Sequence, residues 1–281
     1  MLGAGRAGRG LAHAFRAGGV EVLGVHGRRP AVDGVFSITA GPLPPAIGQA
    51  TVVLVAVRDG QLPSALDEVA AAPLRPGAVV LHASGSAEPR AAMRRLADLG
   101  HPTGTFHPLV PLADPARAPA LVRGAWIGID GDPAALEAGR ALARCVGAHV
   151  LAIPPAGRAA YHAAAVMASN FPTVLAALAA QLMEQAGVDP ADAREAVRHL
   201  MLAAVANLAH AAAGDSLTGP VSRGDADTVA RHLGALASNP ELDLVYRALS
   251  RAALPIAAAQ GADAGALERI RSLAAITPPR R

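Results

Sequence analysis

The chain opens on LGAGRAGRGLAHAF, residues 2–15, a glycine-rich loop that leads into a helical run. Three glycines of the loop have the spacing G-x-G-x-x-G. In a strand–loop–helix unit the first glycine permits a tight turn, the second lets the backbone approach a phosphate, and the third lets helix and strand pack closely. The N–H groups that begin such a helix attract anions. The stretch therefore predicts a dinucleotide-binding domain, with Gly3, Gly5, Arg6, Ala7 and Gly8 around the pyrophosphate.

The residues before this loop are fewer than the pattern requires. Only Met1 and Leu2 precede Gly3, whereas a strand of about five residues is usual. Either the natural start lies upstream or the first strand has been lost. In this form the sequence predicts a nearly absent central strand, and we expect impaired stability or cofactor binding.

The rest of the first half alternates between apolar strand-like runs and helical runs. The strand-like runs span residues 20–27, 51–57, 77–84, 124–130 and 147–153. Continuous apolar strands that alternate with helices indicate a mostly parallel, doubly wound sheet with both faces covered. This α/β domain is predicted to span residues 1–154.

From residue 155 onward the sequence predicts helices only. Alanine- and leucine-rich runs, punctuated by glycine and proline, cover roughly 157–186, 190–213, 225–237, 240–260 and 263–275. We therefore predict an all-α second domain over residues 155–281, which would serve substrate binding and dimerisation.

Composition narrows the possible functions. Apolar residues make up 52% of the 281, yet no uninterrupted apolar run reaches the ~20 residues of a membrane span. No signal peptide pattern starts the chain. The net charge of +3 comes from scattered arginines, and aromatic residues make up only 2% of the chain. Both observations argue against nucleic-acid binding.

One cysteine, Cys145, excludes an internal disulfide and favours the cytoplasm. The chain has no lysine, so any mechanism that needs one is excluded.

The segment HGRRP, residues 26–30, bears on the choice of nucleotide. An acidic residue at the end of the second strand would bind the ribose hydroxyls of NAD, but after His26 the first acidic residue is Asp33. Arg28 and Arg29 instead suit a 2′-phosphate through charge-assisted bonds. The alternative is an exposed arginine pair on a loop. The sequence favours NADP(H) as cofactor.

Further candidates follow the other strands, because ligands of doubly wound sheets bind beyond the carboxyl ends of the strands. Val57, Arg58 and Asp59 follow one strand, and Ser84 follows the next in HASGS. Asp59 could equally cap the next helix. His107, in FHPLVPL (106–112), is predicted to lie in a loop at the edge of the site.

The apolar segment YHAAAVMASNFP, residues 161–172, carries polar groups at helical spacing. At about 100° per residue, Ser169 and Thr173 fall within about 20° of His162, and Asn170 is displaced by about 80°. Tyr161 points elsewhere on this basis. Pro172 removes a backbone N–H and should kink the helix beside Asn170. His162 could donate a proton near neutral pH; the alternative is a buried histidine with satisfied hydrogen bonds.

The segment LTGPVSRGD, residues 217–225, predicts a turn before a helix. Thr218 belongs to the turn, and Asp225 is expected to cap the helix. Arg223 could clamp a substrate carboxylate; the alternative is an ordinary exposed arginine. The remaining histidines have no convincing ligand spacing, so no metal site is predicted.

Taken together, the glycine loop, HASGS, HPLVPL, YHAAAVMASNF and LTGPVSRGD resemble one family over nearly the full chain. It comprises Rossmann-like proteins with a C-terminal domain of unknown function 2520. They look like relatives of pyrroline-5-carboxylate reductase, ketopantoate reductase and the β-hydroxyacid dehydrogenases. The resemblance implies an N-terminal NADP domain, a helical domain like that of 6-phosphogluconate dehydrogenase, and a homodimer formed through it. It does not imply a substrate.

The chain departs from two of these relatives at the reacting centre. β-Hydroxyacid dehydrogenases and ketopantoate reductases use a lysine on the first helix of the second domain, with an asparagine one turn later. Here His162 occupies about the place of that lysine, and Asn170 lies two turns on. A different proton donor, or a different reaction, is required.

These observations predict an NADP-dependent oxidoreductase that transfers a hydride between NADP(H) and a small carbonyl or imine substrate with a carboxylate. His162 is the first choice for proton donor and His107 the second, while Ser169 and Asn170 would orient the reacting group. Arg223, Thr218 and Thr173 would hold the substrate. The alternatives are a ketopantoate or imino-acid reductase specifically, or a non-catalytic NADP-binding or sensing protein.

Overall fold

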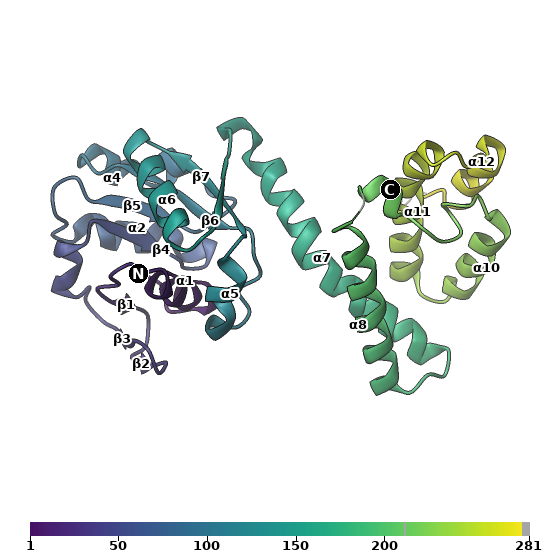
Figure 1. Cartoon of the computed structure of the whole chain (residues 1–281), viewed down its shortest axis with the longest axis horizontal. Helices are drawn as coiled ribbons and strands as arrows, with labels where there is room; N and C mark the ends of the chain where they lie inside the picture. Colours follow the sequence, from purple (N-terminus) through teal and green to yellow (C-terminus); the bar gives the residue numbers. More distant parts are fainter. Residues whose placement is uncertain (211, 277–281) are drawn as a thin grey trace. The chain divides into compact units, whose positions relative to one another are not determined.

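The computed structural model describes residues 1–210 and 212–276. Their contacts divide the chain into two compact units, Met1–Phe171 and a second unit that begins at Pro172 (Figure 1). The division falls inside one long helix, because the first turns of that helix pack against the sheet of the first unit. The units are described separately.

The first unit is built on a sheet of eight short strands. Three of them form the order β1-β3-β2, and five form the order β4-β5-β6-β7-β8. The strands are β1 (Val25–His26), β2 (Ala31–Val32), β3 (Ser37–Thr39), β4 (Val52–Val55), β5 (Val79–His82), β6 (Thr103–Pro108), β7 (Trp126–Gly131) and β8 (His149–Ala152).

A single residue joins the two groups of strands at the place where a first strand would lie. Leu2 forms parallel bridges to His26 of β1 and Val55 of β4. Its N–H donates to the Leu54 carbonyl at 2.9 Å, and its carbonyl accepts from the Ala56 N–H at 2.7 Å. Leu2 therefore takes the position of the central strand, between β1 and β4.

The sheet is mostly parallel. β4, β5 and β6 run parallel to one another, β7 runs antiparallel to β6, and β8 runs parallel to β7. Short β2 is also antiparallel to its neighbour β3.

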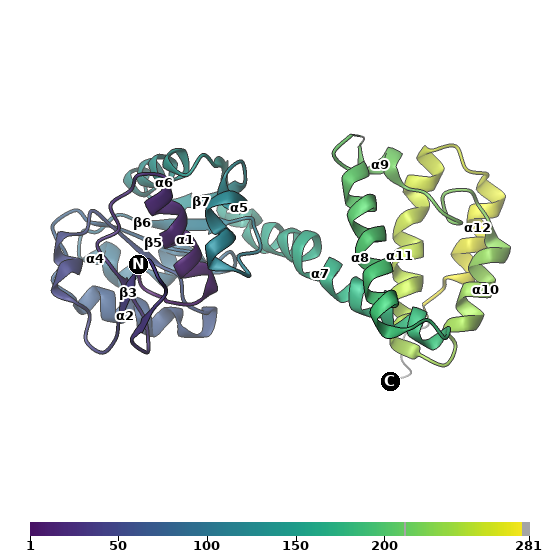
Figure 2. The same ribbon diagram turned by 60° about the horizontal axis from the view of Figure 1, so that its bottom comes forward.

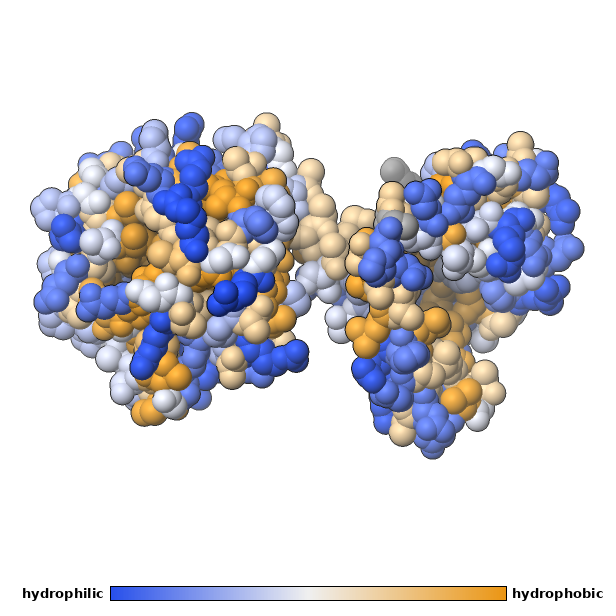
Figure 3. All heavy atoms as spheres, viewed as in Figure 1, coloured by the Kyte–Doolittle hydropathy of each residue, from blue (hydrophilic) through white to orange (hydrophobic). Residues whose placement is uncertain are grey.

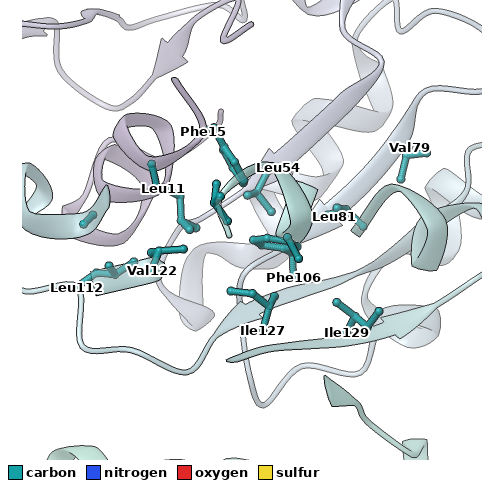
Figure 4. Close-up of a cluster of buried hydrophobic side chains, with 14 of the residues drawn as sticks. Leu11, Phe15, Leu54, Val79, Leu81, Phe106, Leu112, Val122, Ile127 and Ile129 are labelled. Atoms are coloured by element: carbon teal, nitrogen blue, oxygen red, sulfur yellow. The ribbon is translucent and has the colours of Figure 1, made fainter. Parts of the chain in front are cut away.

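Helices cover both faces of this sheet, as a doubly wound fold requires. Leu11, Phe15, Phe106, Ile127 and Ile129 belong to the core on one face, between the sheet and α1 (Arg6–Ala17), α5 (Ala118–Val122) and α6 (Pro133–Cys145) (Figure 4). The core on the other face packs against α2 (Leu62–Ala71), α3 (Pro89–Ala92) and α4 (Arg94–Asp98). The predicted α/β fold class is confirmed.

Strand β6 corrects the prediction for His107. The sequence placed His107 in a loop, but it is the fifth residue of β6 and pairs with Gly128 of β7. Alternate residues of β6 face opposite sides of the sheet. Phe106 enters the hydrophobic core on one side, so Thr105 and His107 lie on the other. Likewise β1 is shorter than the strand predicted over residues 20–27.

The described secondary structure of the second unit consists of helices joined by loops, without a strand, as predicted. Its helices are the latter part of α7 (Arg158–Gln185), α8 (Pro190–Asn207), α9 (Ala213–Ser216), α10 (Ala226–Leu236), α11 (Pro240–Ala259) and α12 (Ala264–Leu273). Figure 2 shows α10, α11 and α12 gathered together. Val229, Leu233, Leu254, Leu267 and Ile270 lie in the core between them.

Helix α7 continues through Pro172 without a break. By length and composition alone, residues Pro155–Gln185 are apolar enough to cross a membrane, with a mean hydropathy of 1.6 over the best window. The sequence has no uninterrupted apolar run of this length, because scattered polar residues interrupt the segment, and for this reason no span was predicted. Its first turns, however, hold a buried ion pair with the sheet through Arg158, so this end of the helix is packed within the protein.

Candidate functional site

The glycine loop has the geometry that a pyrophosphate site needs. Gly3 has φ +112° and lies so close to the Ala56 backbone that a side chain would collide with it. A Cβ on Gly8 would collide with the Gly3 carbonyl. Gly5 is different, since a Cβ there would meet nothing within 4 Å. Gly3 and Gly8 are therefore packed tightly against the protein, whereas the space next to Gly5 is open.

Helix α1 begins at the open side of this loop. Its N-cap residue, Gly5, offers no side-chain cap, and no acidic residue occurs in the first turn. Arg6 and Ala7 of that turn are exposed. Unpaired N–H groups at a helix start and the helix dipole both favour an anion, so these residues fit the phosphates of a dinucleotide.

The end of β1 carries the candidate 2′-phosphate residues. Arg28 and Arg29 come after the strand, separated from it by Gly27, and are exposed. Within the described part of the chain, neither guanidinium takes part in a hydrogen bond or an ion pair. His26 is buried instead, with Nδ1 2.9 Å from the Thr39 hydroxyl oxygen. The arginine pair is therefore free to meet a ligand, and His26 is occupied within the sheet.

A hydrogen-bonded turn connects the ends of β4 and β5. The Ser86 hydroxyl donates to Asp59 Oδ2 at 2.7 Å, and Ser84 Oγ lies 3.2 Å from Ser86 Oγ. Asp59 therefore joins two loops and does not cap α2, whose N-cap is Gln61. Ser84 is buried and also accepts from the Ala87 N–H. Val57 is half-buried and Arg58 exposed at the same edge.

Two imidazoles and a phenol meet beside this turn. His107 Nδ1 lies 2.6 Å from the Tyr161 hydroxyl, and the His107 and His162 rings meet edge to face at 5.9 Å between centroids. A Cβ on Gly85 would come within 2.7 Å of both imidazoles. The glycine of HASGS is thus the residue that lets the loop pass against both rings.

The position of Tyr161 corrects the sequence prediction, which directed it away from the site. Arg158, Tyr161 and His162 are spaced i, i+3 and i+4, so they share one face of α7. That face lies on the sheet: Tyr161 reaches His107, and Arg158 Nη2 donates to Asp130 Oδ2 of β7 at 2.7 Å. The relevant face of the helix is therefore set by the sheet beneath it.

Ser169 and Asn170, which were grouped with His162 by angle, lie about two turns further along α7 and are exposed. Thr173 is exposed too, and belongs to the second unit. The proposed roles of all three stay predictions.

A buried polar stripe underlies the imidazoles on the same face of the sheet. His82 of β5 pairs with Thr105 of β6, and Thr105 pairs with Asp130 of β7. His82 is fully buried, and both its ring nitrogens and the Thr105 hydroxyl lack a hydrogen-bond partner within the described residues. Arg158 is 4% exposed and its Nε is also unpartnered there.

Burial sets the protonation of these groups. Burial first, then the positive charge of Arg158, lowers the pKa of His82 to about 4. Burial, then His162 and Arg158, lowers the pKa of His107 to about 4, against an opposing effect of Asp59. Burial raises the pKa of Tyr161 to about 12, and Arg158 opposes this rise. At neutral pH the site therefore contains a neutral buried imidazole at His82, a neutral half-buried imidazole at His107 and a protonated phenol.

In the second unit, the LTGPVSRGD segment forms the expected helix start. Asp225 accepts from the Thr228 N–H at 3.0 Å and caps α10, which confirms the predicted cap. Thr218 and Arg223 are exposed, and their substrate-binding roles stay predictions. Among the residues that the structure describes, no group of three or more His, Cys, Asp or Glu is placed to hold a metal ion.

Part of the chain matches a known protein family. The model of a family described as a domain of unknown function, DUF2520, matches residues 125–253. No curated protein matches the sequence.

Several solved structures, two of them of reductases, are similar to this chain in fold. Protein TM1727 from Thermotoga maritima is 22% identical, with a TM-score of 0.70 over 92% of this chain and 98% of that one. A pyrroline carboxylate reductase of Plasmodium falciparum with NADP bound is 12% identical, with a TM-score of 0.61 over 98% and 97%. A Streptomyces aurantiacus imine reductase is 21% identical, with a TM-score of 0.55 over 97% of each chain.

At these identities the similarity establishes the fold and not the activity. The family resemblance is confirmed over residues 125–253, which match the DUF2520 model, and the fold of the chain is similar to that of these solved structures.

Proposed function

We propose that the protein is an NADP(H)-dependent oxidoreductase that acts on a small carbonyl or imine substrate carrying a carboxylate. The observation that carries this proposal is one continuous edge of the first unit. Gly3 of the phosphate loop packs on Ala56, the loop after β4 leads to Asp59, and Asp59 binds Ser86 beside the imidazoles. A nucleotide-binding loop and a proton-bearing cluster thus share the carboxyl-end edge of the sheet, where such folds bind ligands.

The residues of this edge fit the cofactor. Gly5 and the start of α1 would hold the pyrophosphate, and Arg28 with Arg29 would hold a 2′-phosphate. Val57, Arg58 and Asp59 would line the nucleotide further along the edge. When bound, NADPH supplies a hydride. The chain itself must then supply binding, orientation and a proton.

Two imidazoles are placed to supply that proton. His107 and His162 both border Gly85, beside the loop that leads to Asp59. A histidine positioned as a general acid contributes about 10²- to 10⁴-fold to a rate. Ser169 and Asn170, further along α7 within the first unit, would orient the reacting group.

The direct test is NADPH oxidation by the full chain with a panel of 2-oxo acids and cyclic imino acids. We expect turnover with at least one carboxylate-bearing substrate. NADPH binding at about micromolar Kd without turnover of any of them would contradict the enzyme and favour a non-catalytic NADP-binding or sensing protein.

The panel also decides between the narrower alternatives. Among the proteins of similar fold, one is a pyrroline carboxylate reductase and another an imine reductase, so cyclic imino acids are the first substrates to test. Ketopantoate would be the discriminating 2-oxo acid. Turnover confined to one of these classes would assign the specific reductase.

A single substitution tests the first-choice proton donor. His162→Ala should lower kcat by about 100-fold if His162 is the acid. Unchanged turnover in an otherwise active protein would remove His162 from that role.

We also propose that the protein is a cytoplasmic homodimer paired through its helical domain. The support is apolar surface on α7 and α8, visible as orange patches on the helical unit in Figure 3. Val174, Leu200, Leu202, Val205 and Leu208 are each more than half exposed, and large exposed apolar patches mark interfaces. Light scattering should give twice the chain mass, and the double substitution Leu202→Glu and Val205→Glu should give the monomer. A wild-type monomer would contradict the proposal.

A further inference from the structure

The bond between Tyr161 and His107 is built by close packing of three elements. Tyr161 comes from α7 and His107 from β6, 54 residues apart, and their rings stand nearly perpendicular at 83°. Gly128 of β7 lies directly under the phenol, where a Cβ would collide with the hydroxyl oxygen. The phenol therefore fits only because β7 has a glycine at this position.

The protonation of the two groups allows a direction of this hydrogen bond that leaves His107 Nε2 as a donor. A neutral imidazole has one nitrogen that accepts and one that donates, whereas a protonated phenol donates readily. The raised pKa of Tyr161 and the lowered pKa of His107 keep the phenol protonated and the imidazole neutral at pH 7. The Tyr161 hydroxyl can therefore donate to Nδ1, and in that arrangement the imidazole proton resides on Nε2.

The Nε2 side of the ring borders the edge proposed for substrate and cofactor. A Cβ on Gly85 would lie 2.8 Å from His107 Nε2 and 2.7 Å from His162 Cδ2. Within the described residues His107 Nε2 makes no hydrogen bond, and the atom is not fully enclosed by the protein. Its N–H is therefore available to a ligand.

We propose that Tyr161 and His107 form a proton relay that serves the oxidoreductase reaction proposed above. The substrate oxygen or nitrogen, as it becomes negative, takes the proton from His107 Nε2. Nδ1 takes the proton of the Tyr161 hydroxyl in the same event, so the imidazole stays neutral throughout. The Nε2–H and phenol O–H bonds break, and the substrate–H and Nδ1–H bonds form. Nδ1 then returns its proton to the tyrosinate while Nε2 takes a proton from water, which leaves hydroxide in the solvent and restores both groups.

Charges around the pair favour this transfer. The Arg158 guanidinium, anchored on Asp130, opposes the rise in the Tyr161 pKa and so favours the tyrosinate. His162 and Arg158 on α7 face His107 and disfavour an imidazolium, whereas Asp59 after β4 favours one, and buried His82 adds no charge while neutral. His107 is then the catalytic residue, and Tyr161, which acts through it, is a positioning residue.

The pairing can be tested without substrate or cofactor. Nitrogen-15 NMR of histidine-labelled full-length protein distinguishes the two neutral tautomers, and His107→Gln identifies the His107 signals among the ten histidines. We expect a neutral His107 with its proton on Nε2 at pH 7, and a loss of this single tautomer in Tyr161→Phe. A proton on Nδ1, an imidazolium, or a spectrum unchanged by Tyr161→Phe would each overturn the relay.

Turnover then tests the proton transfer itself. Tyr161→Phe should lower kcat by about 100-fold and change KM by less than about threefold, because the hydroxyl acts in the reaction and not in binding. The matched control is Tyr246→Phe in the second unit. Tyr246 is the other tyrosine, and it makes the same kind of bond to a histidine, with its hydroxyl oxygen 2.7 Å from His232 Nδ1. This variant should keep the wild-type kcat.

The outcomes separate the relay from the proposed function. A normal kcat in Tyr161→Phe, with turnover abolished in His162→Ala, would assign the proton to His162 and overturn the relay while the oxidoreductase stands. An absence of turnover by the wild type with every substrate would overturn the oxidoreductase and the relay with it, even if the NMR experiment confirms the pairing.

Discussion

Acid should destabilise the first unit through His82, a fully buried histidine whose ring nitrogens have no hydrogen-bond partner within the described residues. Burial lowers its pKa from about 6.5 to about 4. In the unfolded chain the His82 imidazole therefore binds a proton near pH 6.5, whereas in the folded protein it binds one only near pH 4. Folding stability is complete above pH 6.5 and falls as the pH drops through this window.

The size of the effect follows from the shift. One pKa unit corresponds to about 1.4 kcal/mol, so a shift of this size is worth about 3 kcal/mol once the pH is below both values. At about pH 5 the loss from His82 should be about 2 kcal/mol. His107 acts in the same direction, so the contribution of His82 has to be isolated with a variant.

His82→Gln removes the titrating group and keeps a polar side chain. The single tryptophan, Trp126, lies on β7, so its fluorescence during urea unfolding reports on the first unit. The free energy of unfolding should fall between about pH 7.5 and pH 5 by about 2 kcal/mol less in His82→Gln than in the wild type.

The neighbouring Thr105→Val is the matched control, because it alters the same buried stripe without removing a titrating group. It should keep the full pH dependence. It should also be as stable as the wild type or more so, because an unpartnered buried hydroxyl is lost. If wild type and His82→Gln lose equal stability on acidification, a strongly depressed pKa of His82 is refuted.

Three further substitutions test the cofactor edge and its support. Gly5→Val should lower NADPH affinity by about tenfold or more in calorimetry. The melting temperature should not change, because Gly5 has an ordinary φ of −72° and open space around it. An unaltered affinity would mean that the phosphates bind elsewhere. Replacing Arg28 and Arg29 together with alanine should reduce the preference for NADPH over NADH by about tenfold in Kd, and equal preferences before and after would exclude a 2′-phosphate role. Asp130→Asn leaves the Arg158 guanidinium buried without its carboxylate and should lower the free energy of unfolding by about 3 kcal/mol in the Trp126 assay; a loss below about 1 kcal/mol would mean that the ion pair behaves as an exposed one.

Local signals in the sequence predicted much of the fold. The run of Val52–Val55 is apolar throughout, and the helices from Pro190 onward are marked by prolines, glycines and capping acids such as Asp225. Such signals act within a few residues, so they can be read without knowing the rest of the chain. The sequence did not predict strand β6, because TGTFHP, residues 103–108, contains glycine and proline and places polar side chains on one face. Its strand character depends on pairing with β5 and β7.

For the candidate site, the sequence by itself identified the glycine loop, the arginines that come after β1, and the motifs that contain His107 and His162. It could not determine which residue His107 would meet. Tyr161 lies 54 residues away, and a helical angle measured from His162 says nothing about the surface on which the helix lies. Only the tertiary structure placed the 158–162 turn of α7 on β6 and β7. It thereby selected Tyr161 over Ser169 as the neighbour of His107, and the same burial removed water from both groups and fixed their protonation.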